Sequence, residues 1–217
     1  MSMANQPSSK TVKILQQINS NTKLGDLRAM AKEIKKDHVL AMELWASGAF
    51  LPRQLAILIM DSKALSQAEL DKLDKDMQAH DADERTQLAD WLMANQLAKD
   101  KQTIALMQSW QNSASALQRR VFWYYQARLR WMGQTPPDNT KDLVRAIEKN
   151  IAKEAPEVQW AMNFLAGWIG VFESEFRQRC IAIGEKTGLY KGDKVSKNCT
   201  PNYLPEFIAM ESNKRGL

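Results

Sequence analysis

The chain has 217 residues, of which 44% are hydrophobic and 25% are charged, and its formal net charge is +5. This length and composition favour one globular domain over a disordered or fibrous chain. The densest apolar run covers only 160–172, whereas a membrane-spanning helix needs about 20 residues. The polar start MSMANQPSSK lacks the apolar segment of a signal peptide. We therefore expect a cytoplasmic protein without a membrane partner.

Metal and thiol chemistry lacks its usual residues in this sequence. Cys180 and Cys199 are the only cysteines, and neither has a second Cys or a His at metal-ligand spacing. His38 and His80 are isolated as well. We therefore predict no metal site, no Cys–His nucleophile and no cofactor.

Hydrophobic periodicity predicts helices along nearly the whole chain. Val12, Leu15 and Ile18 recur at spacings of three after serines suited to capping. No segment alternates convincingly as a strand. The further helical patterns cover 26–36, 38–47, 51–61, 66–78, 82–99, 101–111, 114–132, 139–154, 156–171, 173–186 and 202–213.

Short breaks separate these segments, among them Gly48, QTPPDNT, Ala155-Pro156 and Gly188. About a dozen helices with tight connections indicate stacked antiparallel pairs. We therefore predict an all-α fold, an α-solenoid of helix pairs, in a single domain over 1–217. From about residue 187 we expect a basic, partly irregular C-terminal segment. Since no repeat is visible in residue identity, a compact helical bundle is an alternative.

The stretch ALQRRVFWYYQARLRWMG, residues 116–133, holds four arginines and five aromatic residues, and 101–137 contains no Asp or Glu. On a helix, Arg119, Trp123 and Arg130 fall on one face. Two interpretations are open. The aromatic residues pack in a core while the arginines pair with carboxylates of neighbouring helices. Alternatively, the arginines hold phosphates while Trp123 lies against a sugar or base.

Residues 22–61, TKLGDLRAMAKEIKKDHVLAMELWASGAFLPRQLAILIMD, resemble the AlkD-type DNA alkylation repair family. The matching motifs are Leu27-Arg28, Ala31–Ile34, Lys36-Asp37, Leu40-Ala41, Leu44-Trp45, Gly48, Arg53, Leu55-Ala56 and Asp61. The tail VSKNCTPNYLPEFI, 195–208, is similar to that of a shorter subgroup. For a divergent, shorter member, the resemblance implies a right-handed stack of HEAT-like helix pairs with duplex DNA on a concave basic face. It also implies cleavage of the N-glycosidic bond of N3- or N7-alkylated purines.

The same resemblance implies catalytic roles for Trp91, Asn95 and Arg119. In LADWLMANQLAK, Trp91 takes the place of a family Trp, and Asn95 stands where the family has its catalytic Asp. Arg119 matches the arginine of a Leu-Gln-Arg triplet. An amide cannot supply the anion that stabilises an oxocarbenium-like sugar, so the sequence leaves enzymatic activity open. The alternative is that Trp91 fills the core and Asn95 is a capping or inter-helix amide.

DNA contacts are expected from a larger set of basic and aromatic residues. By the resemblance, Phe164 stands where the family has a second cleft Trp. The expected DNA-binding residues are Arg119, Arg120, Trp123, Arg130, Phe164, Lys191 and Lys194. Two functions are open for a monomer: a protein that binds duplex, alkylated DNA and cleaves the glycosidic bond, or a non-enzymatic helical-repeat module that binds DNA or a protein.

Overall fold

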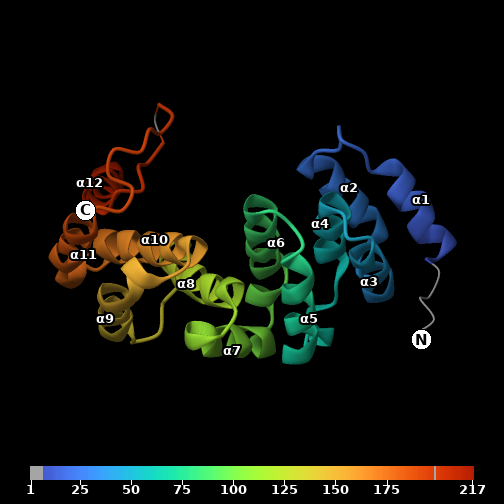
Figure 1. Ribbon diagram of the computed structural model, residues 1–217, viewed down its shortest axis with the longest axis horizontal. Coiled ribbons are helices and arrows are strands. Elements are labelled where there is room, and N and C mark those ends of the chain that lie inside the picture. The colour runs from blue at the N-terminus through green and yellow to red at the C-terminus, as the bar shows by residue number, and fades with distance from the viewer. Residues whose placement is uncertain (1–6, 198) are drawn as a thin grey trace. The chain divides into compact units, whose positions relative to one another are not determined.

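A computed structural model describes residues 7–197 and 199–217, and every regular element within them is a helix (Figure 1). The described residues form twelve α-helices and four 3₁₀ helices. None of these helices is long and apolar enough to cross a membrane. Residues 1–6 of the polar start and Asn198 of the C-terminal motif lie outside the described residues. The all-α prediction is confirmed.

The chain divides into two compact units, Met1–Gln108 and Ser109–Leu217. The first unit contains α1 (Ser9–Gln17), α2 (Leu24–Ile34), α3 (His38–Ala46), α4 (Phe50–Ile59), η1 (Ser62–Ala64), α5 (Gln67–Met77), α6 (Ala82–Asn95), η2 (Leu97–Lys99) and all but the last residue of α7 (Lys101–Ser109). The second unit contains η3 (Trp110–Asn112), α8 (Ala116–Trp131), α9 (Thr140–Asn150), η4 (Ile151–Lys153), α10 (Pro156–Phe172), α11 (Ser174–Thr187) and α12 (Leu204–Arg215). The single domain stays a prediction.

Within each unit, several helices pack on the next helix but one, and some also pack on their neighbour in sequence, as α3 does on α4 and α10 on α11. In the first unit α2 packs on α4 and α4 on α6, while α1 packs on α3. In the second unit α8 packs on α10 and α10 on α12, while α9 packs on α11. Antiparallel helix pairs stack in this way in a solenoid. The prediction of HEAT-like helix pairs is therefore confirmed, and the alternative of a compact helical bundle is not. We call α2, α4, α6, α8, α10 and α12 the even helices.

Three predicted helices pass into a 3₁₀ turn before their hydrophobic pattern ends. The patterns over 82–99 and 139–154 continue as η2 and η4 after α6 and α9 have ended, and the pattern over 101–111 passes from α7 into η3. The last carbonyl groups of an α-helix lack partners, and a 3₁₀ turn is a common way to tighten the chain there. Because a 3₁₀ turn keeps apolar residues on nearly the same face, periodicity alone does not reveal the change.

Most of the motif at 22–61 forms the core of the first unit. Leu27, Leu44 and Leu55 are fully buried. Arg53 lies with its guanidinium carbon 4.8 Å from the centre of the Trp45 ring and donates a hydrogen bond to the Trp45 carbonyl oxygen. These residues therefore explain why the unit folds, and they leave few motif positions free for a ligand.

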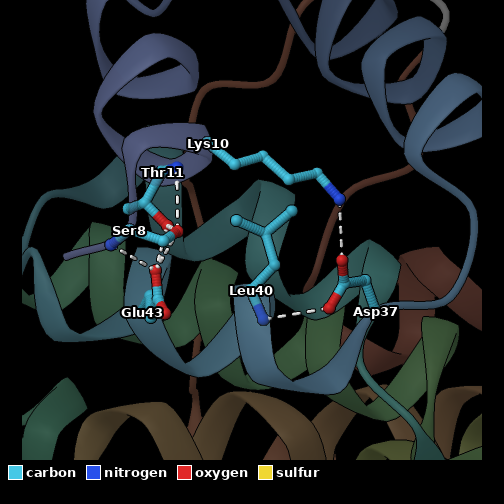
Figure 2. Close-up of polar contacts among 6 residues, drawn as sticks. All are labelled: Ser8, Lys10, Thr11, Asp37, Leu40 and Glu43. Carbon is cyan, nitrogen blue, oxygen red and sulfur yellow. Dashed lines mark hydrogen bonds and ion pairs between the residues drawn. The ribbon is translucent and has the colours of Figure 1, made fainter.

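Polar contacts attach α1 to α3, and Figure 2 shows them converging on two carboxylates. The Ser8 backbone amide and hydroxyl donate to Glu43 Oε2 at 3.0 and 2.6 Å, and the buried Thr11 hydroxyl donates to the same oxygen. These hydrogen bonds, from Ser8 first and then Thr11, hold the pKa of Glu43 below its ordinary value.

The second carboxylate, Asp37, joins α1 to the N-terminus of α3. Its Oδ2 pairs with Lys10 Nζ of α1 at 2.8 Å, and its Oδ1 accepts from the Leu40 amide as the N-cap of α3. The hydrogen bond from Lys10 is the main cause that lowers the pKa of Asp37, followed by that from Leu40. Ionised carboxylates therefore hold α1 in place.

Candidate nucleic-acid interface

Trp91 lies half-buried on α6, where three even helices meet. Its Nε1 donates a hydrogen bond of 3.2 Å to the Gln54 carbonyl oxygen of α4. The Arg28 guanidinium carbon of α2 lies 5.1 Å from the centre of the Trp91 ring. This distance is within the range of a cation–π contact. The indole is thus fixed by α4 and contacted by a cation from α2.

Asn95 is the last residue of α6, and its Nδ2 donates a hydrogen bond of 2.8 Å to the Trp91 carbonyl oxygen. That carbonyl lies four residues before Asn95 within α6, where the Asn95 backbone N–H is its helical donor, so the side chain bonds back to a carbonyl of its own helix. The structure therefore brings Trp91 and Asn95 together, with the Asn95 amide bonded back onto its own helix. A carboxylate at this position could not donate, and it would face the negative end of the helix dipole.

Arg28 has a guanidinium that is available to an external anion. The residue is exposed, and within the described part of the chain no carboxylate pairs with it. Lys32, one helical turn further along α2, is exposed as well. Arg28 is not among the site residues predicted from the sequence, although Leu27-Arg28 is part of the motif. The sequence signal that could have found Arg28 is a basic residue next to a core leucine, in a motif whose other residues mostly pack in the core.

The arginines of α8 find carboxylates on segments that follow it in the chain. Arg119 Nη2 pairs with Glu154 Oε2 at 2.9 Å, and its Nη1 donates to the Ser113 carbonyl oxygen at 2.7 Å. Arg130 Nε pairs with Glu173 Oε1 at 2.6 Å, and the Arg130 side chain is only 1% exposed. The acid-free sequence 101–137 is therefore neutralised in part by later residues, as the packing interpretation expects.

Trp123 is also buried, with 2% of its surface exposed. Its ring lies edge-on to that of Phe122, at 5.0 Å between centres. The placement of Trp123 and of Arg130 inside the second unit favours a packing role for both side chains. A DNA contact by either residue is still only a prediction.

An aromatic row on α10 contacts α8 at Arg120. Trp160 and Phe164 stack with their ring centres 5.0 Å apart, and Tyr124 of α8 lies edge-on to both. The Arg120 guanidinium carbon is 4.7 Å from the Trp160 ring centre, and Nη1 donates to the Glu157 carbonyl oxygen. Trp160, Phe164 and Tyr124 are half-buried and reach solvent. Their partial exposure, together with Arg120, suits stacking against a base or sugar.

Lys191 and Lys194 are exposed in the non-helical segment between α11 and α12. The Lys191 ammonium nitrogen lies 5.9 Å from the ring centre of Tyr203. This segment is basic and lies outside the helices. Residues 7–197 and 199–217 contain no group of three His, Cys, Asp or Glu residues that could hold a metal ion.

The candidate residues lie mainly on the even helices of their own units. Arg28, Trp91 and Asn95 belong to α2 and α6 of the first unit. The residues of the second unit on even helices are Arg119, Arg120, Trp123, Tyr124, Arg130, Trp160 and Phe164. The structure thus brings Trp91 and Asn95 together, and it places Phe164 and Arg120 around the same Trp160 ring. Arg119 pairs with Glu154 within the second unit.

Comparison with known proteins gives one family and one related structure. No curated protein matches the chain. A solved structure is described as "a new family of proteins related to the HEAT-like repeat DNA glycosylases with affinity for branched DNA structures". It is 20% identical to this chain, the match covers 96% of this chain and 89% of that one, and the TM-score is 0.69. This similarity supports the HEAT-like fold. The family model for the DNA alkylation repair enzyme matches residues 18–166, and the chain therefore belongs to the DNA alkylation repair enzyme family.

Proposed function

We propose that this protein binds duplex DNA through the even helices of its units and cleaves N3- or N7-alkylated purines only weakly. The observation that carries the proposal is the exposed Arg28 guanidinium beside the half-buried Trp91. A planar guanidinium with free N–H donors suits a phosphate, and the partly exposed indole offers an apolar surface to a sugar or base.

The second unit supplies further cations and aromatic rings, although its Arg120 is buried and donates to the Glu157 carbonyl oxygen. Arg120 lies over Trp160, and Phe164 stacks on that ring. Arg119 is partly exposed and exchanges Glu154 for a phosphate when DNA binds. Lys191 and Lys194 add positive charge from the irregular segment. The proposed binding is therefore mainly to the backbone, with little preference for sequence.

Weak cleavage follows from the chemistry of Asn95. Loss of an alkylated purine develops positive charge on the sugar, and a nearby carboxylate can stabilise that charge and orient water. Asn95 carries no charge, and its Nδ2 is directed to the Trp91 carbonyl oxygen. The amide oxygen can still orient water, but it cannot act as a general base near neutral pH.

Branched DNA is a second substrate class that we propose for this protein. The solved protein of similar fold is described as related to the HEAT-like repeat DNA glycosylases with affinity for branched DNA structures. A protein that holds phosphates without cleaving efficiently can use its binding energy to recognise DNA shape.

One observation favours a second function, that of a module for a protein partner. Arg119 and Arg130 already pair with Glu154 and Glu173. A surface whose cations are internally paired binds a polyanion less strongly. The two functions differ in their response to salt, since DNA affinity falls with a log–log slope of about 0.9 per neutralised phosphate.

The experiment compares Arg28→Ala with Lys72→Ala, using fluorescence anisotropy of a labelled duplex at several salt concentrations. Both changes remove one positive charge, but exposed Lys72 lies on α5 and pairs with Glu69. We expect Arg28→Ala to weaken binding about five- to tenfold and to reduce the salt slope by about one, with Lys72→Ala near the native affinity. Arg28→Lys should recover only part of the loss, because Lys lacks the planar fork.

A base-release assay tests the catalytic half of the proposal. Duplex DNA containing 7-methylguanine or 3-methyladenine is incubated with excess protein, and released base is measured against the spontaneous rate. We expect tight binding with release only slightly above that rate. Rapid release by the native protein would refute weak cleavage, whereas no salt-dependent DNA binding would favour the protein partner.

A further inference from the structure

A pocket of about 620 Å³ lies between α9 and α11 in the second unit. Its lining residues are Glu148, Lys149, Ala152, Lys153, Ala182, Ile183, Lys186 and Thr187. All of them belong to α9, η4 and α11, and none to an even helix. The pocket is therefore separate from the aromatic row of α10 and from the residues proposed above to bind DNA.

The charge of the pocket is strongly positive. Lys149, Lys153 and Lys186 are exposed, and no ion pair involves them within the residues that the structure describes. The lining carboxylate, Glu148, is already held by Arg179 through bonds of 2.6 and 2.5 Å. These contacts leave three unpaired cations around a neutralised carboxylate.

The electrostatic surroundings of Glu148 support this description. The hydrogen bond from Arg179 lowers the pKa of Glu148 most, and the charges of Arg179, Lys186 and Arg145 lower it further. Arg145 lies on α9 and Lys186 in the last turn of α11. The cations of both helices therefore act at the same place.

The distribution of the cations fits a chain of phosphates better than one phosphate group. Lys149 and Lys153 are four residues apart along α9 and η4, and Lys186 lies across the pocket on α11. Apolar Ala152 and Ala182 between the lysines offer no base-specific hydrogen bonds, so the expected contact is to a nucleic-acid backbone.

We propose that the α9–α11 pocket binds the phosphodiester backbone of a second DNA arm, so that the second unit contacts branched DNA on two separate surfaces. This inference rests on the proposed function, in which the even helices hold the first arm. A linear duplex occupies the even helices alone, whereas a junction reaches both surfaces.

The test compares two triple variants on two probes. Lys149→Gln, Lys153→Gln and Lys186→Gln together remove the pocket charge, and Lys63→Gln, Lys72→Gln and Lys75→Gln remove the same charge from exposed positions of the first unit. Fluorescence anisotropy measures the affinity of each for a four-way DNA junction and for a linear duplex of the same arm sequence. Circular dichroism checks that both variants keep the native helix content.

We expect the pocket variant to lose about tenfold in affinity for the junction while its affinity for the linear duplex stays within about twofold. Its salt slope should fall by about 0.9 per lost phosphate contact on the junction only. The control variant should change both probes equally and little. Equal losses on both probes for the pocket variant, or no loss on either, would overturn the inference.

The proposed function fails by a different result. If Arg28→Ala leaves duplex binding unchanged while the pocket variant still loses junction binding, the proposed DNA contact of Arg28 is refuted, but the pocket is a DNA site. The native protein could instead bind the duplex but bind the junction no more tightly than the number of its duplex arms predicts. That result would refute only the pocket inference.

Discussion

Replacing Asn95 by Asp tests the catalytic reading of α6 with a change of one functional group. The substitution removes the Nδ2 donor that now bonds to the Trp91 carbonyl oxygen at 2.8 Å. It places a negative charge at the last residue of the helix. Since two oxygens repel, the new carboxylate should turn away from the helix end and become available to a bound substrate.

The Asn95→Asp substitution should destabilise the fold and stabilise the transition state of base release. A lost hydrogen bond costs about 0.5 to 1.5 kcal/mol, and an anion at a helix C-terminus costs about 0.3 to 1 kcal/mol. The sum should lower the midpoint of thermal unfolding by a few degrees. A restored anion near an oxocarbenium-like sugar should contribute about 2 to 4 kcal/mol, on the order of a hundredfold in rate.

The assay measures single-turnover release of 7-methylguanine and 3-methyladenine from duplex DNA by the native protein, Asn95→Asp and Asn95→Ala. Asn95→Ala is the matched control, because it loses the same hydrogen bond to Trp91 but gains no charge. Binding of the same duplex is measured in parallel. The difference between the two variants therefore isolates the effect of the anion.

We expect Asn95→Asp to exceed both other proteins in base release. If Asn95→Asp binds the duplex normally but releases no more base than Asn95→Ala, Asn95 does not occupy the catalytic position. The catalytic role that the family resemblance implies for this residue is then wrong. If the native protein is active and Asn95→Ala is not, the amide itself orients water, and the argument for weak cleavage is refuted.

Three further predictions follow from contacts away from Asn95. Asp37 and Glu43 have folded pKa values below their ordinary ones, so the stability that they give to α1 should be complete above pH about 5 and lost as the pH falls through the folded values. Amide hydrogen exchange in α1 measures this loss, and protection that stays unchanged down to pH 3 would contradict the prediction. Arg130→Met should lower the free energy of unfolding in urea by about 3 kcal/mol, because it leaves Glu173 without its buried partner, and it should leave the affinity for duplex DNA unchanged. Lost DNA binding at unchanged stability would instead support a DNA contact by Arg130. Burial raises the pKa of the Cys180 thiol to about 12, so iodoacetamide at pH 8 should label exposed Cys199 and leave Cys180 intact in the folded protein, as mass spectrometry can check.

The helices and their stacking could be predicted because they depend on repeated local patterns. The segment 114–132 has the apolar spacing, the Ser115 cap and the absence of Gly and Pro that a long helix requires, and the structure has α8 there. Helix ends were less predictable. Within 82–99 the chain changes to 3₁₀ geometry after Asn95, and this change does not alter the periodicity of the apolar residues.

The partners of charged residues could not be predicted from local sequence. The segment 101–137 has no acidic residue, yet Arg130 pairs with Glu173, 43 positions away. Trp123 similarly lies on the face expected for arginines but is buried. Charge patterning along the chain predicts a positive surface only when the tertiary neighbours are also lacking in carboxylates. By contrast, Arg28 lies in a sequence that also contains acidic Asp26 and Glu33, and yet it is the exposed cation over the Trp91 ring.

Binding and catalysis place different demands on this architecture, and the difference explains how one can be kept while the other is weak. A phosphate backbone is attracted over roughly 8 Å at physiological salt, so several cations on the even helices can act without exact placement. Stabilising an oxocarbenium-like sugar needs an anion at a defined place beside it. At Asn95 a single NH₂ group in place of an oxygen removes that anion, and the same NH₂ group donates to the Trp91 carbonyl oxygen of its own helix. The amide is thus favourable for the helix and unfavourable for cleavage, while Arg28, which carries the proposed phosphate contact, does not depend on it.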